Sequence, residues 1–73
     1  MYSGMVEHPL SLSGMEKLLK KAGALRVSDN AKIAFREVLE EIGEELGKKA
    51  VKFSGHSKRK TIKAEDIKLA HKS

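Results

Sequence analysis

Basic side chains that could bind phosphate groups gather in two separate stretches of the sequence. The denser stretch contains Lys58, Arg59, Lys60 and Lys63. The earlier stretch contains Lys17, Lys20, Lys21 and Arg26. The segment between them carries a group of five glutamates, Glu37, Glu40, Glu41, Glu44 and Glu45, together with more widely spread basic residues. Because lysine and arginine bind phosphates through charge and hydrogen bonds, this separation predicts a polyanionic partner, with nucleic acid as the first candidate.

The overall composition agrees with this chemistry and argues against several others. The 73 residues carry 15 Lys and Arg against 10 Asp and Glu, a formal charge of +5, so a symmetric dimer would carry +10. There is no cysteine, and the histidines (His8, His56 and His71) are scattered, so we expect no disulfide, no metal and no cofactor. A glycine-rich phosphate loop and a nucleophile with a nearby base are also missing, so no catalytic residue and no enzymatic activity is predicted.

Hydropathy and length bear on location and assembly. No apolar run approaches the roughly 20 residues that span a bilayer, so we expect a cytoplasmic protein with no membrane partner. A chain of this length buries a modest fraction of its surface on folding. With no disulfide or metal to stabilise it, a second chain is the expected source of stability.

The basic stretches must be positioned by helices, and the first predicted helix runs from about Ser13 to Ala22. Ser13 and Glu16 fit the S-x-x-E capping box that starts many helices. Apolar residues then recur at helical spacing, at Met15, Leu18, Leu19 and Ala22. Gly23 follows as a helix stop, because glycine tolerates the left-handed backbone that closes a helix.

A much longer helix is predicted from the N-cap Ser28 to about His56. Its apolar stripe comprises Ala31, Ala34, Phe35, Val38, Leu39, Ile42, Leu46, Ala50 and Phe53. At 1.5 Å per residue this helix is about 40 Å long, and the first helix cannot cover the whole stripe. Much of the stripe should therefore meet another chain. Gly43 costs stability inside a helix, and close crossing of two helices there would explain it.

A short third helix is predicted to begin between Thr61 and Ala64 and to finish with His71 and Lys72. Its first turn contains Glu65 and Asp66, which suit the positive end of the helix dipole. Before the first helix, residues 1–10 show no periodicity, and we interpret them as a flexible lead-in without an assigned function. Residues 11–73 are interpreted as one all-α domain with the order short helix, long helix, short helix.

Three runs of this sequence resemble the archaeal histones. They are the run Ala22-Gly23-Ala24-Leu25-Arg26-Val27-Ser28-Asp29, the run Val38-Leu39-Glu40-Glu41-Ile42-Gly43-Glu44-Glu45 and the run Arg59-Lys60-Thr61-Ile62-Lys63-Ala64-Glu65-Asp66-Ile67. The resemblance extends without a gap from about Leu12 to the C-terminus. It implies the histone fold, an obligate intertwined dimer, and binding of double-stranded DNA without base readout, leading to compaction. The dimer is formed by two identical chains or with another histone-fold chain, and tetramers or longer superhelices can follow.

The resemblance also implies which residues bind DNA. In the implied dimer the long helices cross antiparallel, so that the first loop of one chain lies beside the second loop of the other. Residues that match family positions near phosphates or the minor groove are Lys17, Arg26, Lys60 and Lys63, with Arg26 as the minor-groove residue. Ser28 and Thr61 match hydrogen-bonding positions, and Lys20 is a peripheral contact.

Lys58 departs from the family pattern, because glycine is common at its position. A positive φ there would strain a lysine, although the side chain could add a phosphate contact. Gly47 and Ser11 also depart from the pattern, since they replace a usual alanine and a frequent proline.

Further implied roles concern assembly. Arg59 and Asp66 match an internal ion pair. The family positions that form the contact between dimers correspond to Phe53, His56, Asp66 and Leu69. A hypothesis of stacking between layers of a DNA superhelix assigns close approach to Gly23 and ion pairs to Glu37, Glu41, Lys68 and Lys72, whose pairs each have i, i+4 spacing.

Two other functions compete with DNA packaging. A histone-fold pair that serves as a protein-assembly scaffold would touch DNA little and would not need basic loops. A helix-turn-helix regulator would read bases in the major groove. A helix of nearly thirty residues does not suit that compact motif, and the acids at the start of the third helix do not suit DNA recognition. The basic loops and the helix lengths therefore favour packaging.

Overall fold

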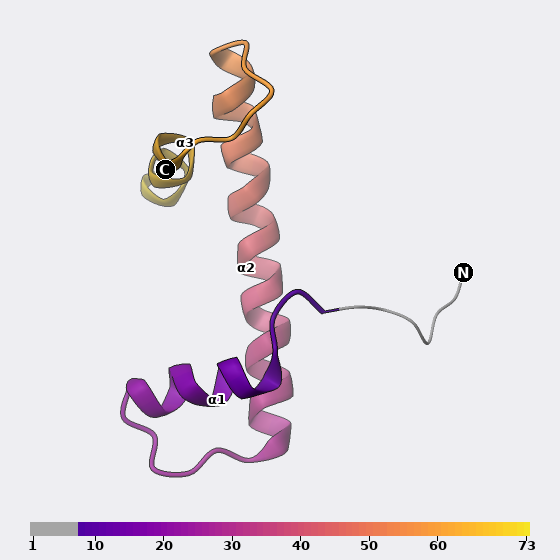
Figure 1. Cartoon of the computed structure of the whole chain (residues 1–73), viewed down its shortest axis with the longest axis vertical. Coiled ribbons are helices and arrows are strands. Elements are labelled where there is room, and N and C mark those ends of the chain that lie inside the picture. Colours follow the sequence, from indigo (N-terminus) through magenta and orange to yellow (C-terminus); the bar gives the residue numbers. More distant parts are fainter. Residues whose placement is uncertain (1–7) are drawn as a thin grey trace, which may run out of the picture. The chain divides into compact units, whose positions relative to one another are not determined.

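The computed structural model describes residues 8–73 and contains a short, a long and a short helix in that order (Figure 1). Helix α1 comprises Leu12–Lys21, α2 comprises Asp29–His56 and α3 comprises Ala64–Lys72. No strand occurs within the described residues. The predicted all-α architecture and helix order are confirmed.

The start of α1 differs from the prediction, because Ser11 rather than Ser13 is the N-cap. The backbone N–H of Gly14 donates to Ser11 Oγ at 3.0 Å. A Cβ at residue 14 would lie 3.0 Å from that oxygen, so glycine leaves room for the cap. Leu10 and Met15 also have the spacing of a hydrophobic staple around Ser11. The predicted Ser13–Glu16 capping box is therefore wrong, since two serines compete for one helix start and their surroundings select the earlier one.

The other helix boundaries agree with the sequence pattern. Ser28 Oγ accepts a hydrogen bond from the backbone N–H of Ala31 at 3.1 Å, as expected of the residue that caps α2. Helix α2 ends at His56 and α3 begins at Ala64, both within the predicted limits. None of the helices in residues 8–73 is long and apolar enough to cross a membrane.

The chain divides into two compact units, the first ending at Glu40 and the second comprising Glu41–Ser73. The first unit buries Met15, and the second buries Ala50 and Ala70 as its apolar core. Large apolar residues of the long stripe remain open, with Val38 50% and Ile42 55% exposed. A single chain therefore leaves much of its apolar surface uncovered.

The lead-in predicted for residues 1–10 lies mostly outside the described residues. Of its last three residues, His8 contacts α2: its Nδ1 lies 3.1 Å and 3.3 Å from the two carboxylate oxygens of Glu40. This contact belongs to the first unit and was not predicted, because nothing in the sequence pairs residues 32 positions apart.

Candidate nucleic-acid interface

Each compact unit contains one of the two basic loops. The first loop, residues 22–28, joins α1 to α2, and the second loop, residues 57–63, joins α2 to α3 (Figure 1). Both loops leave their preceding helix through the same backbone geometry, although different residues occupy its critical position.

The first loop leaves α1 through a Schellman motif centred on Gly23. The N–H of Gly23 donates to Lys20 O, and the N–H of Ala24 donates to Leu19 O, both at 3.0 Å. Gly23 has a φ of +119°, which residues other than glycine rarely adopt. The predicted role of Gly23 as a helix stop is confirmed.

The first loop exposes its arginine. Arg26 is exposed and forms no ion pair within residues 8–73. Lys17 on α1 is likewise exposed, whereas Lys20 Nζ lies 3.0 Å from Glu16 Oε2. Leu25, the neighbour of Arg26 in the sequence, is 92% exposed, and no role was predicted for it from the sequence. Next to it, a hollow is lined by Leu19, Ala24, Arg26, Val27, Ser28 and Ala31.

An ionic cluster ties α1 to the first turn of α2. Lys32 Nζ lies 3.3 Å from both Glu16 Oε1 and Asp29 Oδ1, and its side chain is 18% exposed. The carboxylates of Asp29 and Glu16 raise the pKa of Lys32, and hydrogen bonds from Lys20 and Lys32 lower the pKa of Glu16. Sequence spacing predicted a capping role for Glu16, but its carboxylate instead pairs with Lys20 on α1 and with Lys32 on α2.

The second loop also begins with a Schellman motif, and here the critical residue is Lys58. The N–H of Arg59 donates to Ser54 O at 3.0 Å, and the N–H of Lys58 donates to Gly55 O at 2.9 Å. Lys58 has a φ of 57°, the left-handed conformation that favours glycine. The backbone therefore keeps the geometry that glycine usually provides, at the cost of strain at a lysine.

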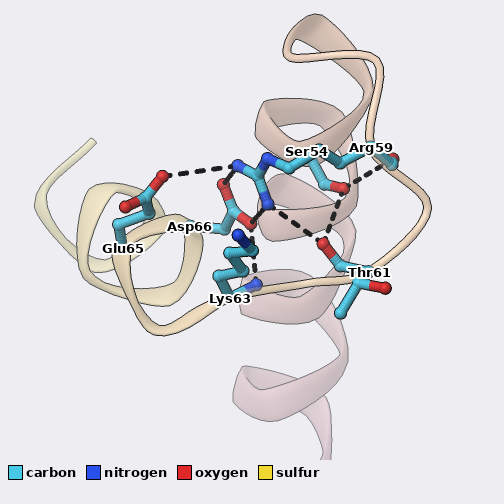
Figure 2. Close-up of polar contacts among 6 residues, drawn as sticks. All are labelled: Ser54, Arg59, Thr61, Lys63, Glu65 and Asp66. Carbon is cyan, nitrogen blue, oxygen red and sulfur yellow. Dashed lines mark hydrogen bonds and ion pairs between the residues drawn. The ribbon is translucent and has the colours of Figure 1, made fainter.

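Side chains brace the rest of the second loop (Figure 2). Arg59 donates two hydrogen bonds to Asp66, Nη1 to Oδ2 at 3.0 Å and Nη2 to Oδ1 at 2.9 Å. Arg59 Nη1 also donates to the carbonyl of Thr61 at 3.0 Å, and Asp66 Oδ2 accepts from the backbone N–H of Lys63 at 2.8 Å. Glu65 adds a longer contact of 3.5 Å to Arg59 Nη2.

The charge state of this cluster follows from its contacts. The side chain of Asp66 is 2% exposed and that of Arg59 is 23% exposed. The hydrogen bonds from Arg59, followed by the N–H of Lys63, lower the pKa of Asp66, and Asp66 raises the pKa of Arg59. Because the guanidinium of Arg59 is bound to the buried Asp66, Arg59 is not one of the cations that the loop presents to solvent.

Ser54 joins this cluster from the last turns of α2, and its role was not predicted from the sequence. The side chain is buried, and Oγ donates to Arg59 O at 2.8 Å, with Thr61 O at 3.3 Å (Figure 2). The only indication in the sequence is its spacing, because Ser54 follows Ala50 of the apolar stripe by four residues and so lies on the same face of the helix. Serine at that position is compatible with many surroundings, so the pattern alone did not indicate a bond to the loop.

Three cations of the second loop remain available. Lys58, Lys60 and Lys63 are exposed and take part in no ion pair within the part of the chain that the structure describes. Thr61 is exposed as well, although its carbonyl is used inside the loop. The loop thus turns its arginine inward and leaves its lysines free to meet an anion.

The residues implied in assembly are placed differently from one another. His56 and Leu69 are exposed and Phe53 is half-buried. Asp66 is occupied by Arg59 and Lys63, so a contact with a second dimer would have to reach a carboxylate that is 2% exposed. The residues of the stacking hypothesis are all exposed, namely Gly23, Glu37, Glu41, Lys68 and Lys72. Within residues 8–73, no three His, Asp or Glu side chains come together as metal ligands.

Comparison with known proteins identifies the family. The family described as histone-like transcription factor (CBF/NF-Y) and archaeal histone matches residues 9–70. One chain of the archaeal histone HAN1 of Thermococcus zilligii is 50% identical over 64 residues, which cover 88% of this chain and 96% of that protein. Probable archaeal histone 3 of Methanocaldococcus jannaschii is 54% identical over 54 residues, which cover 74% of this chain and 81% of that protein. The chain therefore belongs to the family of histone-like transcription factors and archaeal histones, and its three helices form a histone fold.

Proposed function

We propose that this protein binds double-stranded chromosomal DNA without reading its sequence and compacts it. The observation that carries this proposal is the set of exposed cations in both loops, Arg26 in the first and Lys58, Lys60 and Lys63 in the second. None of them forms an ion pair within residues 8–73, so binding a phosphate would not require breaking an existing pair. Phosphate contacts are the same on every sequence, which favours non-specific binding.

We propose further that the binding unit is a dimer, formed by two identical chains or with another histone-fold chain. The exposed apolar residues of α2, including Val38 and Ile42, need a covering surface. A Cβ at Gly43 would meet nothing within 4 Å in the single chain, which leaves room for a second helix to approach closely. Antiparallel crossing of the two α2 helices would place the first loop of one chain beside the second loop of the other.

Within such a dimer, we assign each DNA-binding residue a role from the chemistry of its side chain. Lys17, Lys60 and Lys63 would bind phosphates, with Lys20 at the periphery and Lys58 as an additional contact. Arg26 would enter an inward-facing minor groove, where arginine adds grip without base readout. Ser28 and Thr61 would donate hydrogen bonds from their hydroxyl groups.

Assembly beyond the dimer is a finer part of the proposal. Four residues would join dimers into tetramers or longer superhelices, namely Phe53, His56, Asp66 and Leu69. Close approach at Gly23 and ion pairs among Glu37, Glu41, Lys68 and Lys72 would stack neighbouring layers. A Gly23→Leu variant that compacts long DNA as the parent does, measured by sedimentation, would contradict the role of Gly23.

The competing function is that of a protein-assembly scaffold that touches DNA little and, like the proposed histone, has no enzymatic activity. A scaffold has no need for exposed cations without ion pairs in both loops, Arg26 in the first and Lys58, Lys60 and Lys63 in the second. Its binding to DNA would be weak and unaffected by the loop residues. Titration with DNA separates the two functions.

The test is a titration of mixed-sequence duplex at several salt concentrations. The parent is compared with the triple variant Arg26→Ala, Lys60→Ala, Lys63→Ala, and with a matched control, Lys48→Ala, Lys49→Ala, Lys52→Ala, which removes the same charge from α2. For the parent we expect a steep loss of affinity with salt. In the loop variant the log–log slope should shrink by about 0.9 for each phosphate that is no longer bound. Equal binding by the loop variant, or a flat salt dependence of the parent, would exclude this mechanism.

A further inference from the structure

We infer that Ser54 is a positioning residue for the DNA-binding loop, which it holds in its binding conformation before DNA arrives. The inference rests on the proposed function, because the loop in question is the second basic loop. Ser54 itself lies inside α2 and is only 4% exposed, so it cannot contact DNA. Its effect must pass through the backbone to which it is bonded.

The first step is that the centre of the second loop lacks backbone support. Within residues 8–73, no backbone–backbone hydrogen bond involves residues 60–62. The polar backbone groups next to the exposed lysines are instead held by side chains. Arg59 Nη1 serves the carbonyl of Thr61, and Asp66 serves the N–H of Lys63. The conformation that presents Lys60 and Lys63 therefore depends on the side chains around it.

The second step is that Ser54 binds the carbonyl of Arg59, which the side chains of the Arg59–Asp66 ion pair do not bind. A hydroxyl group has a single proton to donate, and the shorter of its two contacts, 2.8 Å, goes to Arg59 O. Thr61 O at 3.3 Å already accepts from Arg59. No other donor to Arg59 O occurs in the described part of the chain. Ser54 is therefore the side chain that satisfies this carbonyl.

The third step is that two hydrogen bonds join Ser54 and Arg59. The N–H of Arg59 donates to Ser54 O at 3.0 Å, while Ser54 Oγ donates to Arg59 O at 2.8 Å. Both polar backbone groups of Arg59 are thus bonded to one residue of α2. This fixes the backbone from which the Arg59 side chain reaches Asp66, and it does so directly after the strained Lys58.

Preorganisation of this kind favours binding because the ordering of the loop is completed before association. Loss of the hydroxyl should therefore weaken DNA binding while leaving the number of phosphate contacts unchanged. A contact residue behaves differently, since its loss also lowers the salt slope. The salt slope consequently distinguishes positioning from contact.

The experiment compares Ser54→Ala with the parent and with Ser57→Ala, an exposed serine of the same loop whose hydroxyl makes no hydrogen bond in residues 8–73. Alanine favours helix, so the Ser54 variant should retain α2. DNA affinity is measured on mixed-sequence duplex against salt, well below the unfolding temperature. We expect Ser54→Ala to bind about threefold to tenfold more weakly, as for one missing hydrogen bond, with an unchanged salt slope. Ser57→Ala should match the parent.

A second measurement does not depend on DNA. Backbone ¹⁵N relaxation of the free proteins should show larger fast motion of the amides from Arg59 to Lys63 in Ser54→Ala and not in Ser57→Ala. Unchanged loop motion, or DNA affinity equal to that of the parent, would overturn the inference. If the parent itself fails to bind DNA, the proposed function fails, and the relaxation data still decide whether Ser54 holds the loop.

Discussion

The two loops begin with the same hydrogen-bonded turn but are stabilised in different ways. In the first loop Gly23 takes the positive φ, and no side-chain hydrogen bond reaches residues 24–27 within the described chain. In the second loop Lys58 takes the positive φ, and Ser54, Arg59 and Asp66 bind the backbone that follows. A turn that favours glycine can thus be made by a lysine when neighbouring side chains hold the loop.

This difference bears on how each loop would meet DNA. The second loop is organised by contacts within one unit of one chain, so its lysines are already presented. The centre of the first loop has no such brace within the described residues, and its Leu25 is 92% exposed. In the proposed dimer, where the two loops lie side by side, we expect the braced second loop to be the more rigid member of each pair.

The largest effect is expected from breaking the brace with Asp66→Asn. The variant removes the charge that holds Arg59, and it places an amide where a carboxylate accepted three hydrogen bonds. Thermal unfolding at a fixed protein concentration should show a far larger loss of stability for Asp66→Asn than for Glu65→Gln, because the Glu65 side chain is 70% exposed. Similar losses for the two variants would mean that the second loop is not braced by this ion pair.

The same variant tests the pH dependence of the brace. The pKa of Asp66 is lowered below its ordinary value of 3.8 in the folded protein, so the stability from its ionised form is complete above that value. It is lost as the pH falls through the lowered pKa. The difference in stability between the parent and Asp66→Asn should therefore shrink below about pH 4. A difference that stays constant down to about pH 2 would contradict this assignment.

The next largest effect is expected from Gly23→Ala in the first loop. A Cβ there would meet nothing within 4 Å, so the cost comes from the backbone alone. We expect a loss of about 1–2 kcal/mol in unfolding free energy. The control is Gly55→Ala, also without a neighbour within 4 Å but in α2, which should stabilise by about 0.5–1 kcal/mol. The same sign for both variants would show that φ does not control the first turn.

The smallest effect, of opposite sign, is expected from Lys58→Gly. Glycine relieves the positive φ, so the variant should be about 1 kcal/mol more stable than Lys58→Ala, which loses the same charge but keeps the strain. Both variants should lose DNA affinity equally if Lys58 contacts a phosphate. Chemical denaturation and DNA titration of the pair separate the two effects. Equal stability of the two variants would mean that the second turn carries no strain.

Several features of the site were predictable because they depend on neighbours in the chain. Ser28 as a helix cap and Gly23 as a helix stop follow from local backbone requirements. The strain at Lys58 was expected from the resemblance instead, because glycine is common at that position in the family. The choice of Ser11 over Ser13 was not predictable from the capping pattern. Both serines satisfy the local rule, and the free space at Gly14 and the flanking apolar residues favour Ser11.

What the sequence by itself determined is the helix order, the two basic loops and the excess of apolar surface on α2. These follow from periodicity, capping residues and charge, which act over a few neighbouring positions. Only the tertiary structure decided which basic residues face solvent. Arg59 turns inward to Asp66, Lys32 joins Glu16, and Ser54 bonds the loop backbone. Such partners are chosen by distances in the folded chain, and the spacing of residues along the sequence does not contain them.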